Sequence, residues 1–488
     1  MMGRMTELDF YLAQLSPLMA VLVTVLHLLG LAMAVVALLN ARTPQGAIAW
    51  SLFLVMFPVL GLPIYFVFGE RRFVGYVRAR REGRQPLQAL AQAVAARHLP
   101  ALKAEFAPEE RDLAVFEALA AMPFVRGNRA RLLVNGEATF EAIFAGIDAA
   151  RDYLLVQFYI VRDDDIGRAL QARLIARARD GIRIHFMYDA IGSFELPERY
   201  LAALREAGIA VQPFHGRTHR NPRRYQLNFR NHRKIVVADG RQAWVGGHNV
   251  GDEYLGRDPA LSPWRDTHVE LNGPAALGVQ LAFLEDWHAM TGEIPDLDWE
   301  AQPDPADQRV LVLPSGPADE VETCGLMFTE IIHMARRRLW IVSPYFVPDD
   351  TIVSALQLAA LRGVDVRLMI PEKADHHLVH VAGFAYLDEL LPLGIRIFRY
   401  HEGFLHQKAF LMDDSLAGVG TANLDNRSFR LNFEMFLLFA DAGFVGATEA
   451  MLEEDFRHCR ELSLAEFEHR PWPFRLGARV ARLFAPVL

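Results

Sequence analysis

Two long apolar runs dominate the hydrophobic pattern at the start of this chain. Residues 18–39 and 47–68 are each 22 residues long and carry no Asp, Glu, Lys or Arg. A helix needs about 20 apolar residues to cross a hydrocarbon core of roughly 30 Å, so each run predicts a spanning helix. A signal peptide followed by a buried helix fits less well, because the first run is longer than a signal core and a second run follows. The sequence therefore predicts a transmembrane hairpin over residues 1–70.

Positive charges flank the second apolar run. Arg42 lies between the runs, and six arginines lie between residues 71 and 84. Positive residues near the ends of a span stay in the cytoplasm, so both termini and everything after the hairpin are expected on the cytoplasmic face. Residues 71–122 are expected to form a basic juxtamembrane segment and a connecting helix.

The remaining pattern alternates strand-like runs with helix-like periodicity, and it does so twice. Residues 154–160 and 339–347 are apolar runs that each lead into an amphipathic helix ending at glycine. This alternation predicts an α/β fold made of two duplicated α/β/α sandwich halves, 123–300 and 301–488.

Composition narrows the class of protein. The 488 residues are 52% hydrophobic and 23% charged, which excludes extended disorder. The net charge of −8 argues against a general nucleic-acid binder. Cys324 and Cys459 are the two cysteines of the chain, too few for a disulfide framework or a structural zinc site.

Each half ends in the same set of polar residues. The first set is His232, Lys234, Asp239 and Asn249, and the second is His406, Lys408, Asp413 and Asn423. The histidine and the asparagine are 17 positions apart in both sets. Such a doubled match of fixed residue types at fixed spacing is a strong motif signal.

The residue types suit phosphoryl chemistry. Histidine and lysine two positions apart on a strand share one face, whereas Asp239 has the opposite parity and opens an Asp-Gly turn away from that face. Imidazole, ammonium and the amides of Asn249 and Asn423 can hold a phosphate. With two such walls facing each other, one neutral histidine can attack phosphorus while the other, protonated, donates to the leaving oxygen.

Each histidine needs an acceptor that orients its ring. Asp266 and Glu434 both lie at the start of the strand that follows their motif. Each is predicted to accept a hydrogen bond from the histidine of its own half. The alternative is that both are ordinary carboxylates at a strand edge.

The doubled motif resembles the phospholipase D superfamily, and its detail resembles bacterial cardiolipin synthases. The matching stretches are 50–70, 157–167, 230–239, 246–254, 265–268, 344–349, 406–434 and 471–472. Gly247 and Thr421 occupy a position that is often Ser in the family, so contacts to phosphate are expected to differ between the halves. The resemblance implies two phospholipase D-like halves sharing one active site, with Asp239 and Asp413 as members of the catalytic motif.

The resemblance also implies a two-step exchange in the bacterial inner membrane. A phosphatidyl group moves to a histidine with loss of an alcohol, and the hydroxyl of a second lipid then takes it. For two phosphatidylglycerols the products are cardiolipin and glycerol. No cofactor or metal is expected, because Lys234 and Lys408 can meet the phosphoryl charge. His232 is favoured as the nucleophile and His406 as the acid, although the geometry also allows the reverse.

Two other functions stay open at this stage. With water as acceptor the same histidines would make a phospholipase D or a nucleic-acid phosphodiesterase, and the apolar runs and acidic balance argue against nucleic acid. A membrane scaffold with a dead site is disfavoured because both residue sets are complete. The oligomeric state is open.

Three weaker signals accompany the motif. Arg217, Arg220, Arg223, Arg224 and Arg230 form a stretch that suits anionic headgroups or a solvated loop. The tail 470–488 alternates arginines with apolar residues, as an interfacial helix or a helix packed on the soluble part would. His376 and His380 have metal-like spacing without a third ligand.

Overall fold

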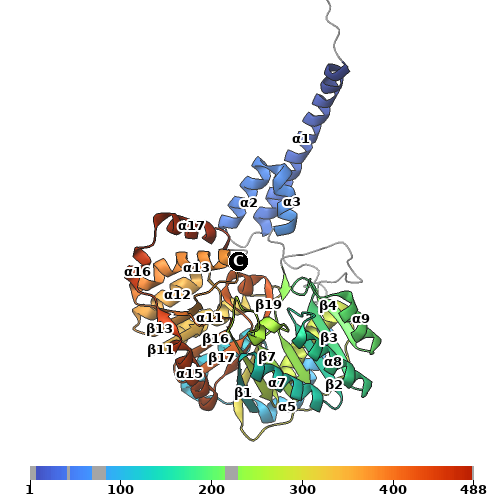
Figure 1. The fold of residues 1–488 in the computed structure, drawn as a ribbon, viewed down its shortest axis with the longest axis vertical. Helices are drawn as coiled ribbons and strands as arrows, with labels where there is room; N and C mark the ends of the chain where they lie inside the picture. Colours follow the sequence, from blue (N-terminus) through green and yellow to red (C-terminus); the bar gives the residue numbers. More distant parts are fainter. Residues whose placement is uncertain (1–6, 41–43, 69–83, 215–228, 486–488) are drawn as a thin grey trace, which may run out of the picture. The chain divides into compact units, whose positions relative to one another are not determined.

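The computed structural model describes residues 7–40, 44–68, 84–214 and 229–485. The chain divides into two compact units, one comprising residues 1–77 with 224–228 and the other comprising 78–223 with 229–488. Figure 1 labels the elements of both. We call them the membrane unit and the catalytic unit and describe each by itself.

The described residues of the membrane unit form the helices α1 (Glu7–Asn40), α2 (Pro44–Met56) and α3 (Pro58–Phe68). Within the described residues, one helix segment, Met19–Asn40 of α1, is long and apolar enough to cross a membrane. The second apolar run was expected to form the second spanning helix of a hairpin. In the structure this run is divided at Phe57 into α2 and α3, so a second spanning helix is not confirmed. Pro58 explains the break, since proline cannot continue a helix but suits the first position of a new one.

Helices α2 and α3 pack against each other in antiparallel fashion and against α1. The rings of Trp50 in α2 and Tyr65 in α3 lie 5.0 Å apart. A Cβ at Gly30 of α1 would collide with the carbonyl oxygen of Leu54 and lie 3.1 Å from the Pro58 side chain. The glycine therefore permits close packing, and the α2–α3 turn lies beside the middle of the apolar part of α1.

A single sheet of 16 strands forms the centre of the catalytic unit. Its first strand group consists of β1 (Val125–Val134), β2 (Tyr153–Phe158), β3 (Arg183–Asp189), β4 (Ala210–Phe214), β5 (Arg230–Asn231), β6 (Ile235–Ala238), β7 (Gln242–Gly246) and β9 (Thr267–Asn272). Its second strand group consists of β10 (Gln308–Ser315), β11 (Arg338–Val342), β13 (Asp365–Pro371), β14 (Arg396–Tyr400), β16 (Ala409–Met412), β17 (Leu416–Gly420), β19 (Asn432–Phe439) and β20 (Cys459–Glu461). Two small ladders pair β8 (Trp264–Arg265) with β15 (Phe404–Leu405) and β12 (Phe346–Val347) with β18 (Leu424–Asp425).

The strand order is the same on both sides of the central β1–β10 pair. It runs β1-β9-β7-β6-β2-β3-β4 in the first group and β10-β19-β17-β16-β11-β13-β14 in the second. β1 and β10 pair in antiparallel register, with Val125 opposite Val310. The two groups are thus joined into one continuous mixed α/β sheet.

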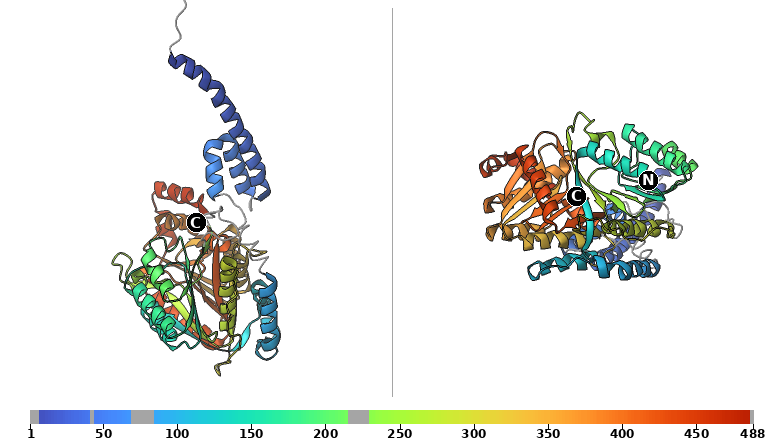
Figure 2. Two further views of the ribbon diagram at one scale, coloured as in Figure 1. Left: turned by 90° about the vertical axis from the view of Figure 1, so that its right-hand side faces the viewer. Right: turned by 90° about the horizontal axis from the view of Figure 1, so that it is seen from below.

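Helices cover both faces of this sheet (Figure 2). They are α5 (Arg84–Leu102), α6 (Ala114–Ala120), α7 (Asn135–Ala149), α8 (Asp165–Arg179), α9 (Glu198–Glu206), α10 (Ala275–Thr291), α11 (Thr323–Met334), α12 (Asp350–Leu361), α13 (His377–Leu390), α14 (Asn426–Arg430), α15 (Ala442–Arg457), α16 (Leu464–Glu468) and α17 (Trp472–Arg482). Short 3-10 helices span Pro108–Leu113, Asp252–Leu255 and Leu391–Leu393.

Strand β2 illustrates how sequence alternation produces the layers. Leu154 and Val156 join the core cluster that includes α7 and α8. On the opposite face the Tyr153 hydroxyl donates to Gln280 of α10 at 2.7 Å. Because successive side chains of a strand point to opposite faces, the strand is buried under helices on both sides.

Candidate active site

Both motif histidines lie on segments that pair with the other strand group. The backbone N–H of His232 donates to the Phe433 carbonyl at 2.9 Å, next to the β5–β19 pairing. The backbone N–H of His406 donates to the Arg265 carbonyl at 2.8 Å, next to the β15–β8 pairing. Each histidine is therefore held in place by backbone of the opposite group.

The orienting carboxylates are crossed in the same way. His232 Nδ1 lies 2.9 Å from Glu434 Oε2, and His406 Nδ1 lies 2.7 Å from Asp266 Oδ2. Both predicted carboxylates contact a motif histidine, but the predicted pairing within each half is wrong, because each contacts the histidine of the other half. The strand pairing explains the exchange, because Glu434 directly follows the residue that binds the His232 backbone, and Asp266 directly follows the residue that binds His406. With Nδ1 donating to a carboxylate, Nε2 of each ring keeps its lone pair for chemistry.

The motif lysines are buried next to the histidines. Lys234 is fully buried and its Nζ donates to the His232 carbonyl at 2.6 Å, and Lys408 Nζ donates to the His406 carbonyl. Burial lowers the pKa of Lys408 to about 8 and that of Lys234 well below its usual value. An ammonium has three N–H groups, so each lysine retains donors for an anionic ligand.

Burial also fixes the resting charge of the histidine–carboxylate pairs. It lowers the pKa of His232 to about 4 and that of His406 well below its usual value. Burial alone would raise the pKa of Glu434, but the charge of His232, their hydrogen bond and Lys234 together lower it to about 2. At neutral pH the site thus holds neutral imidazoles beside ionised Glu434.

The two carboxylates are held by different numbers of donors. Glu434 accepts from Thr421 Oγ1 at 2.6 Å and from Asn432 Nδ2 at 3.1 Å, besides His232. In the first group Gly247 has no side chain, and a Cβ there would overlap the Asp266 carboxylate. The expected difference at Gly247 and Thr421 therefore concerns the carboxylates that orient the histidines.

Aromatic rings that the sequence analysis did not single out line both histidines. The Tyr159 ring lies 5.0 Å from the His232 ring and 5.4 Å from Lys234 Nζ. The Trp264 ring lies 5.1 Å from the His406 ring. Tyr159 is the second-last residue of the strand-like run 154–160, and Trp264 directly precedes the Arg-Asp pair at 265–266. Both residues therefore lie in or beside stretches that the sequence analysis had marked.

The two motif asparagines differ in their hydrogen bonds. Asn249 Oδ1 accepts from the Ile160 backbone at 3.1 Å, and its Nδ2 donates to the Tyr254 hydroxyl at 2.8 Å. Asn423 is buried, and its Oδ1 has no partner among the described residues. Asn249 therefore holds the side chain of Tyr254, and the centre of the Tyr254 ring lies 6.2 Å from that of the His406 ring.

The motif aspartates are not brought to the histidines. Asp239 and Asp413 have left-handed backbone angles in the turns after β6 and β16. The Asp239 carboxylate accepts from the backbone N–H groups of residues 151–153, and the Asp413 carboxylate from those of 336–338. They fasten turns to the starts of β2 and β11, as the parity of Asp239 indicated.

Two weaker signals of the sequence concerned a metal-like histidine pair and a stretch of arginines before the first motif. Within the described part of the chain no group of three or more His, Cys, Asp or Glu side chains could hold a metal, including around His376 and His380. The arginines of the stretch before the first motif lie outside the described residues, except Arg230.

Comparison with protein families matches two parts of the chain. Residues 328–458 match a family described as cardiolipin synthase, phospholipase D-like domain. Residues 28–70 match a family described as phospholipase D-nuclease N-terminal.

Curated relatives match nearly the whole chain. Cardiolipin synthase A of Pseudomonas putida is 47% identical over 478 residues, covering 96% of this chain and 98% of that protein. Cardiolipin synthase A of Pseudomonas aeruginosa is 48% identical over 476 residues, covering 95% of each. Among solved structures, phosphatidylserine synthase of Haemophilus influenzae shares the fold with a TM-score of 0.58 at 15% identity, covering 78% of this chain and all of that one.

Proposed function

Since the chain belongs to the cardiolipin synthases of the phospholipase D superfamily, we propose that it converts two phosphatidylglycerol molecules into cardiolipin and glycerol. As an enzyme of this family it is a phosphatidyltransferase that makes cardiolipin. What we propose beyond this is the identity of the donor and the acceptor, the covalent intermediate and the role of each residue. The pair of crossed histidine–carboxylate contacts in one buried site supports it most directly.

In the first step Nε2 of neutral His232 attacks the phosphorus of one phosphatidylglycerol. His406 takes up a proton from solvent when the anionic phosphodiester binds beside it. The bond from phosphorus to the headgroup glycerol oxygen then breaks, a phosphorus–nitrogen bond forms, and His406 gives that proton to the departing glycerol. Glu434 holds the His232 ring through Nδ1 and stabilises the positive charge that develops on it. The ammonium groups of Lys234 and Lys408 offset the charge on the phosphoryl oxygens.

In the second step the hydroxyl of another phosphatidylglycerol attacks the phosphatidyl-histidine. His406, now neutral, takes the proton of that hydroxyl, the phosphorus–nitrogen bond breaks, and cardiolipin leaves. Overall, one phosphorus–oxygen ester bond is broken and another of the same kind is formed. The reaction therefore needs no nucleotide to drive it. Both histidines return to their starting protonation states.

We keep His232 as the nucleophile and His406 as the acid, the assignment that the sequence favoured. Glu434, which holds the His232 ring, is itself fixed by the Thr421 hydroxyl and the Asn432 amide, whereas Asp266 accepts from one further donor among the described residues, the Thr267 backbone N–H. The low pKa of His232 keeps it neutral and nucleophilic. Burial also lowers the pKa of His406, and the negative phosphodiester binding beside it would raise that pKa again.

We also propose that Asn423 binds the substrate phosphate and that Asn249 acts through Tyr254. The unpartnered Oδ1 of Asn423 marks a buried amide whose hydrogen bonds are incomplete without a ligand. The amide can turn its N–H groups to a phosphoryl oxygen. Asn249 already uses both polar atoms of its side chain.

We further propose that the catalytic unit is a duplication with halves 123–300 and 301–488, following the segments 1–70 and 71–122. The matching strand order of the two groups supports it. The crossed contacts of His232 and His406 would then be exchanged across the internal repeat.

The protein is membrane-associated, and we propose the bacterial inner membrane with the catalytic unit on the cytoplasmic side. At 1.5 Å per residue, the 13 residues of α2 extend about 20 Å and the 11 of α3 about 16 Å, short of a full crossing. In place of a hairpin of two spans, α1 crosses once, and α2 and α3 enter and leave on the cytoplasmic side. The arginines around the second apolar run favour this side.

Product analysis tests the function. Purified full-length protein in vesicles receives labelled phosphatidylglycerol as sole phospholipid, with chelator and without nucleotide. Cardiolipin and free glycerol are expected from the wild type and neither from His232→Ala or His406→Ala. Phosphatidic acid as the main product would mean that water is the acceptor and would overturn the synthase mechanism.

A further inference from the structure

Helix α17 carries a continuous apolar stripe that faces solvent. Its members, with the two residues that follow the helix, are Trp472, Leu476, Val480, Leu483 and Phe484. Leu476 is 54% exposed and Leu483 is 77% exposed. Positions 472, 476, 480 and 483 follow the three- and four-residue spacing of one helix face, so the exposure belongs to a whole side of the helix.

The opposite face of α17 is firmly packed. Ala478 and Ala481 are buried, and the Phe474 ring lies 5.2 Å from the Phe384 ring of α13. Figure 1 shows α17 lying over α13 at the edge of the catalytic unit. The helix is therefore held on the α/β core by one side, and its apolar stripe is directed outward.

Arginines lie along the border between these two faces. Arg479 is 3.6 Å from Asp388, and Arg482 pairs with Glu389, both on α13. Arg475 is exposed, and the Arg470 guanidinium lies 4.2 Å from the Phe384 ring. An exposed apolar face bordered by arginines, with tryptophan at one end, has the composition of a helix at a lipid–water interface.

We propose that α17 is a membrane-docking helix whose apolar stripe inserts into a bilayer containing anionic phospholipid. The docking proposal rests on the proposed function, in which a lipid substrate must leave the bilayer to reach the buried histidines. Arg479 and Arg482 are paired with carboxylates of α13, but the exposed Arg475 beside the stripe complements anionic headgroups, which makes a lipid surface the favoured occupant over an uncharged apolar partner.

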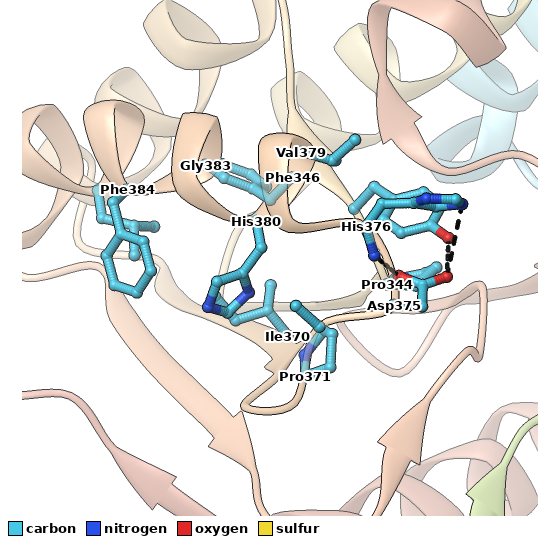
Figure 3. Close-up of a pocket in the computed structure, with 13 residues that line it drawn as sticks. Pro344, Phe346, Ile370, Pro371, Asp375, His376, Val379, His380, Gly383 and Phe384 are labelled. Atoms are coloured by element: carbon cyan, nitrogen blue, oxygen red, sulfur yellow. Dashed lines mark hydrogen bonds and ion pairs between the residues drawn. The ribbon is translucent and has the colours of Figure 1, made fainter. Parts of the chain in front are cut away.

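A hollow beside α13 lies next to the proposed docking helix and could receive a lipid substrate. It is open to solvent, and its walls include Phe346, Ile370, Val379 and Leu387. Figure 3 shows His376 and Asp375 at one end of it and His380 between Ile370 and Phe384. The wall of this hollow, α13, is the same helix on which α17 packs.

The polar end of the hollow lies near the catalytic residues. Asp375 accepts from the Tyr345 hydroxyl. Phe346, in the wall of the hollow, pairs with Leu424, which directly follows Asn423, and the charge of Asp375 raises the pKa of Lys408. A phospholipid drawn from a bilayer at α17 could thus keep its chains against the apolar wall while its phosphate approaches the lysines.

Kinetics with two forms of substrate test the docking role. The full chain carrying both Leu476→Asn and Leu483→Asn is compared with the wild type and with a control variant, Leu361→Asn. Leu361 is an exposed leucine at the end of α12, before β13 begins, whereas the hollow lies at the other end of β13. We expect kcat/KM on phosphatidylglycerol vesicles to fall at least tenfold in the double variant only. On a short-chain phosphatidylglycerol in monomeric solution all three proteins should be equally active.

Equal losses on both substrates would mean a structural role and would overturn the proposal, as would no loss on vesicles. A wild type that makes no cardiolipin from either substrate would instead refute the proposed function.

Docking is therefore also measured by an assay that does not depend on activity. Leu476→Cys and Leu361→Cys are labelled with a fluorophore in a background with Cys459→Ser, and the full chain is placed in vesicles carrying a lipid-bound quencher. We expect quenching at residue 476 that increases with the fraction of anionic lipid, and little at residue 361. Protection of residue 476 that depends on protein concentration in detergent would identify a second copy as the occupant and overturn the proposal.

Discussion

At the scale of single residues, the proposed chemistry depends on two exchanged contacts. His232 is oriented by Glu434 and His406 by Asp266, so each ring depends on a carboxylate from the other strand group. The motif residues themselves were predictable, because His, Lys and Asn repeat at the same spacing. The exchange was not, because it depends on the β5–β19 and β15–β8 pairings between residues more than 100 positions apart.

The absence of a side chain at Gly247 should be essential. In Gly247→Ser the new Cβ would displace the Asp266 carboxylate and with it the His406 ring. We expect kcat to fall by roughly 10²-fold or more, the size of the contribution of a positioned acid or base. Thr421→Ser is the matched control at the equivalent position, and it should retain most activity because the hydroxyl that donates to Glu434 remains. Near-normal activity of Gly247→Ser would contradict this account of Asp266.

The pH dependence of kcat/KM should be bell-shaped. On the acid side His232, whose pKa is about 4, gains a proton and loses the lone pair that attacks phosphorus. On the alkaline side His406, whose pKa is lowered by burial, loses the proton that it must donate, and Lys408, whose pKa is about 8, loses the charge that binds phosphate. Initial rates in detergent at low substrate concentration report the free enzyme, so activity should fall on the acid side near pH 4 and be lost on the alkaline side by about pH 8. Activity that stays constant from pH 7 to 10 would contradict a charged Lys408 in the mechanism.

The motif aspartates should act on stability rather than on chemistry. In Asp413→Asn the left-handed turn remains accessible, but three backbone N–H groups lose an ionised acceptor. Hydrogen bonds to charged groups contribute about 1.5–3 kcal/mol each, and we expect the free energy of unfolding to fall by about this much in total. Denaturant titration measures the loss, and Asp414→Asn, next in the chain and exposed, should change little. A variant of normal stability with kcat reduced 100-fold would return Asp413 to the catalytic residues.

At the scale of elements, helix breaks were harder to predict than strands. The alternating runs correctly indicated β2 and β11, since buried strands leave a clear pattern of apolar residues. The second apolar run was correctly recognised as apolar, but hydrophobicity does not specify whether a helix continues through Pro58. The structure has a turn there, and Gly30 allows that turn to pack on α1.

The α2–α3 turn predicts where the start of α1 lies. If α1 crosses once, a cysteine at Gln14 should react with an impermeant maleimide added to intact cells. A cysteine at Gln45, at the start of α2, should react only after the membrane is opened. Protection of residue 14 together with labelling of residue 45 in intact cells would support the two-span hairpin with both ends in the cytoplasm and contradict a single crossing.

At the scale of the whole molecule, the catalytic unit is one sheet with one site. The α/β class was predictable from the alternation of runs, whereas the joining of both strand groups through β1 and β10 was not, because edge pairing leaves no separate mark in the sequence. The consequence is that neither group could carry out the reaction alone, since each lacks the carboxylate that orients its histidine.

The central claim is that a phosphatidyl group resides on His232 between the two steps. The most direct measurement is rapid quenching of the wild type with phosphorus-labelled phosphatidylglycerol, followed by peptide mapping under conditions that preserve a phosphorus–nitrogen bond. The account predicts label on the peptide that contains His232, appearing before cardiolipin and lost when excess unlabelled phosphatidylglycerol is added. Label on the His406 peptide would reverse the roles of the two histidines, and cardiolipin formed at full rate with no labelled peptide would contradict the covalent mechanism.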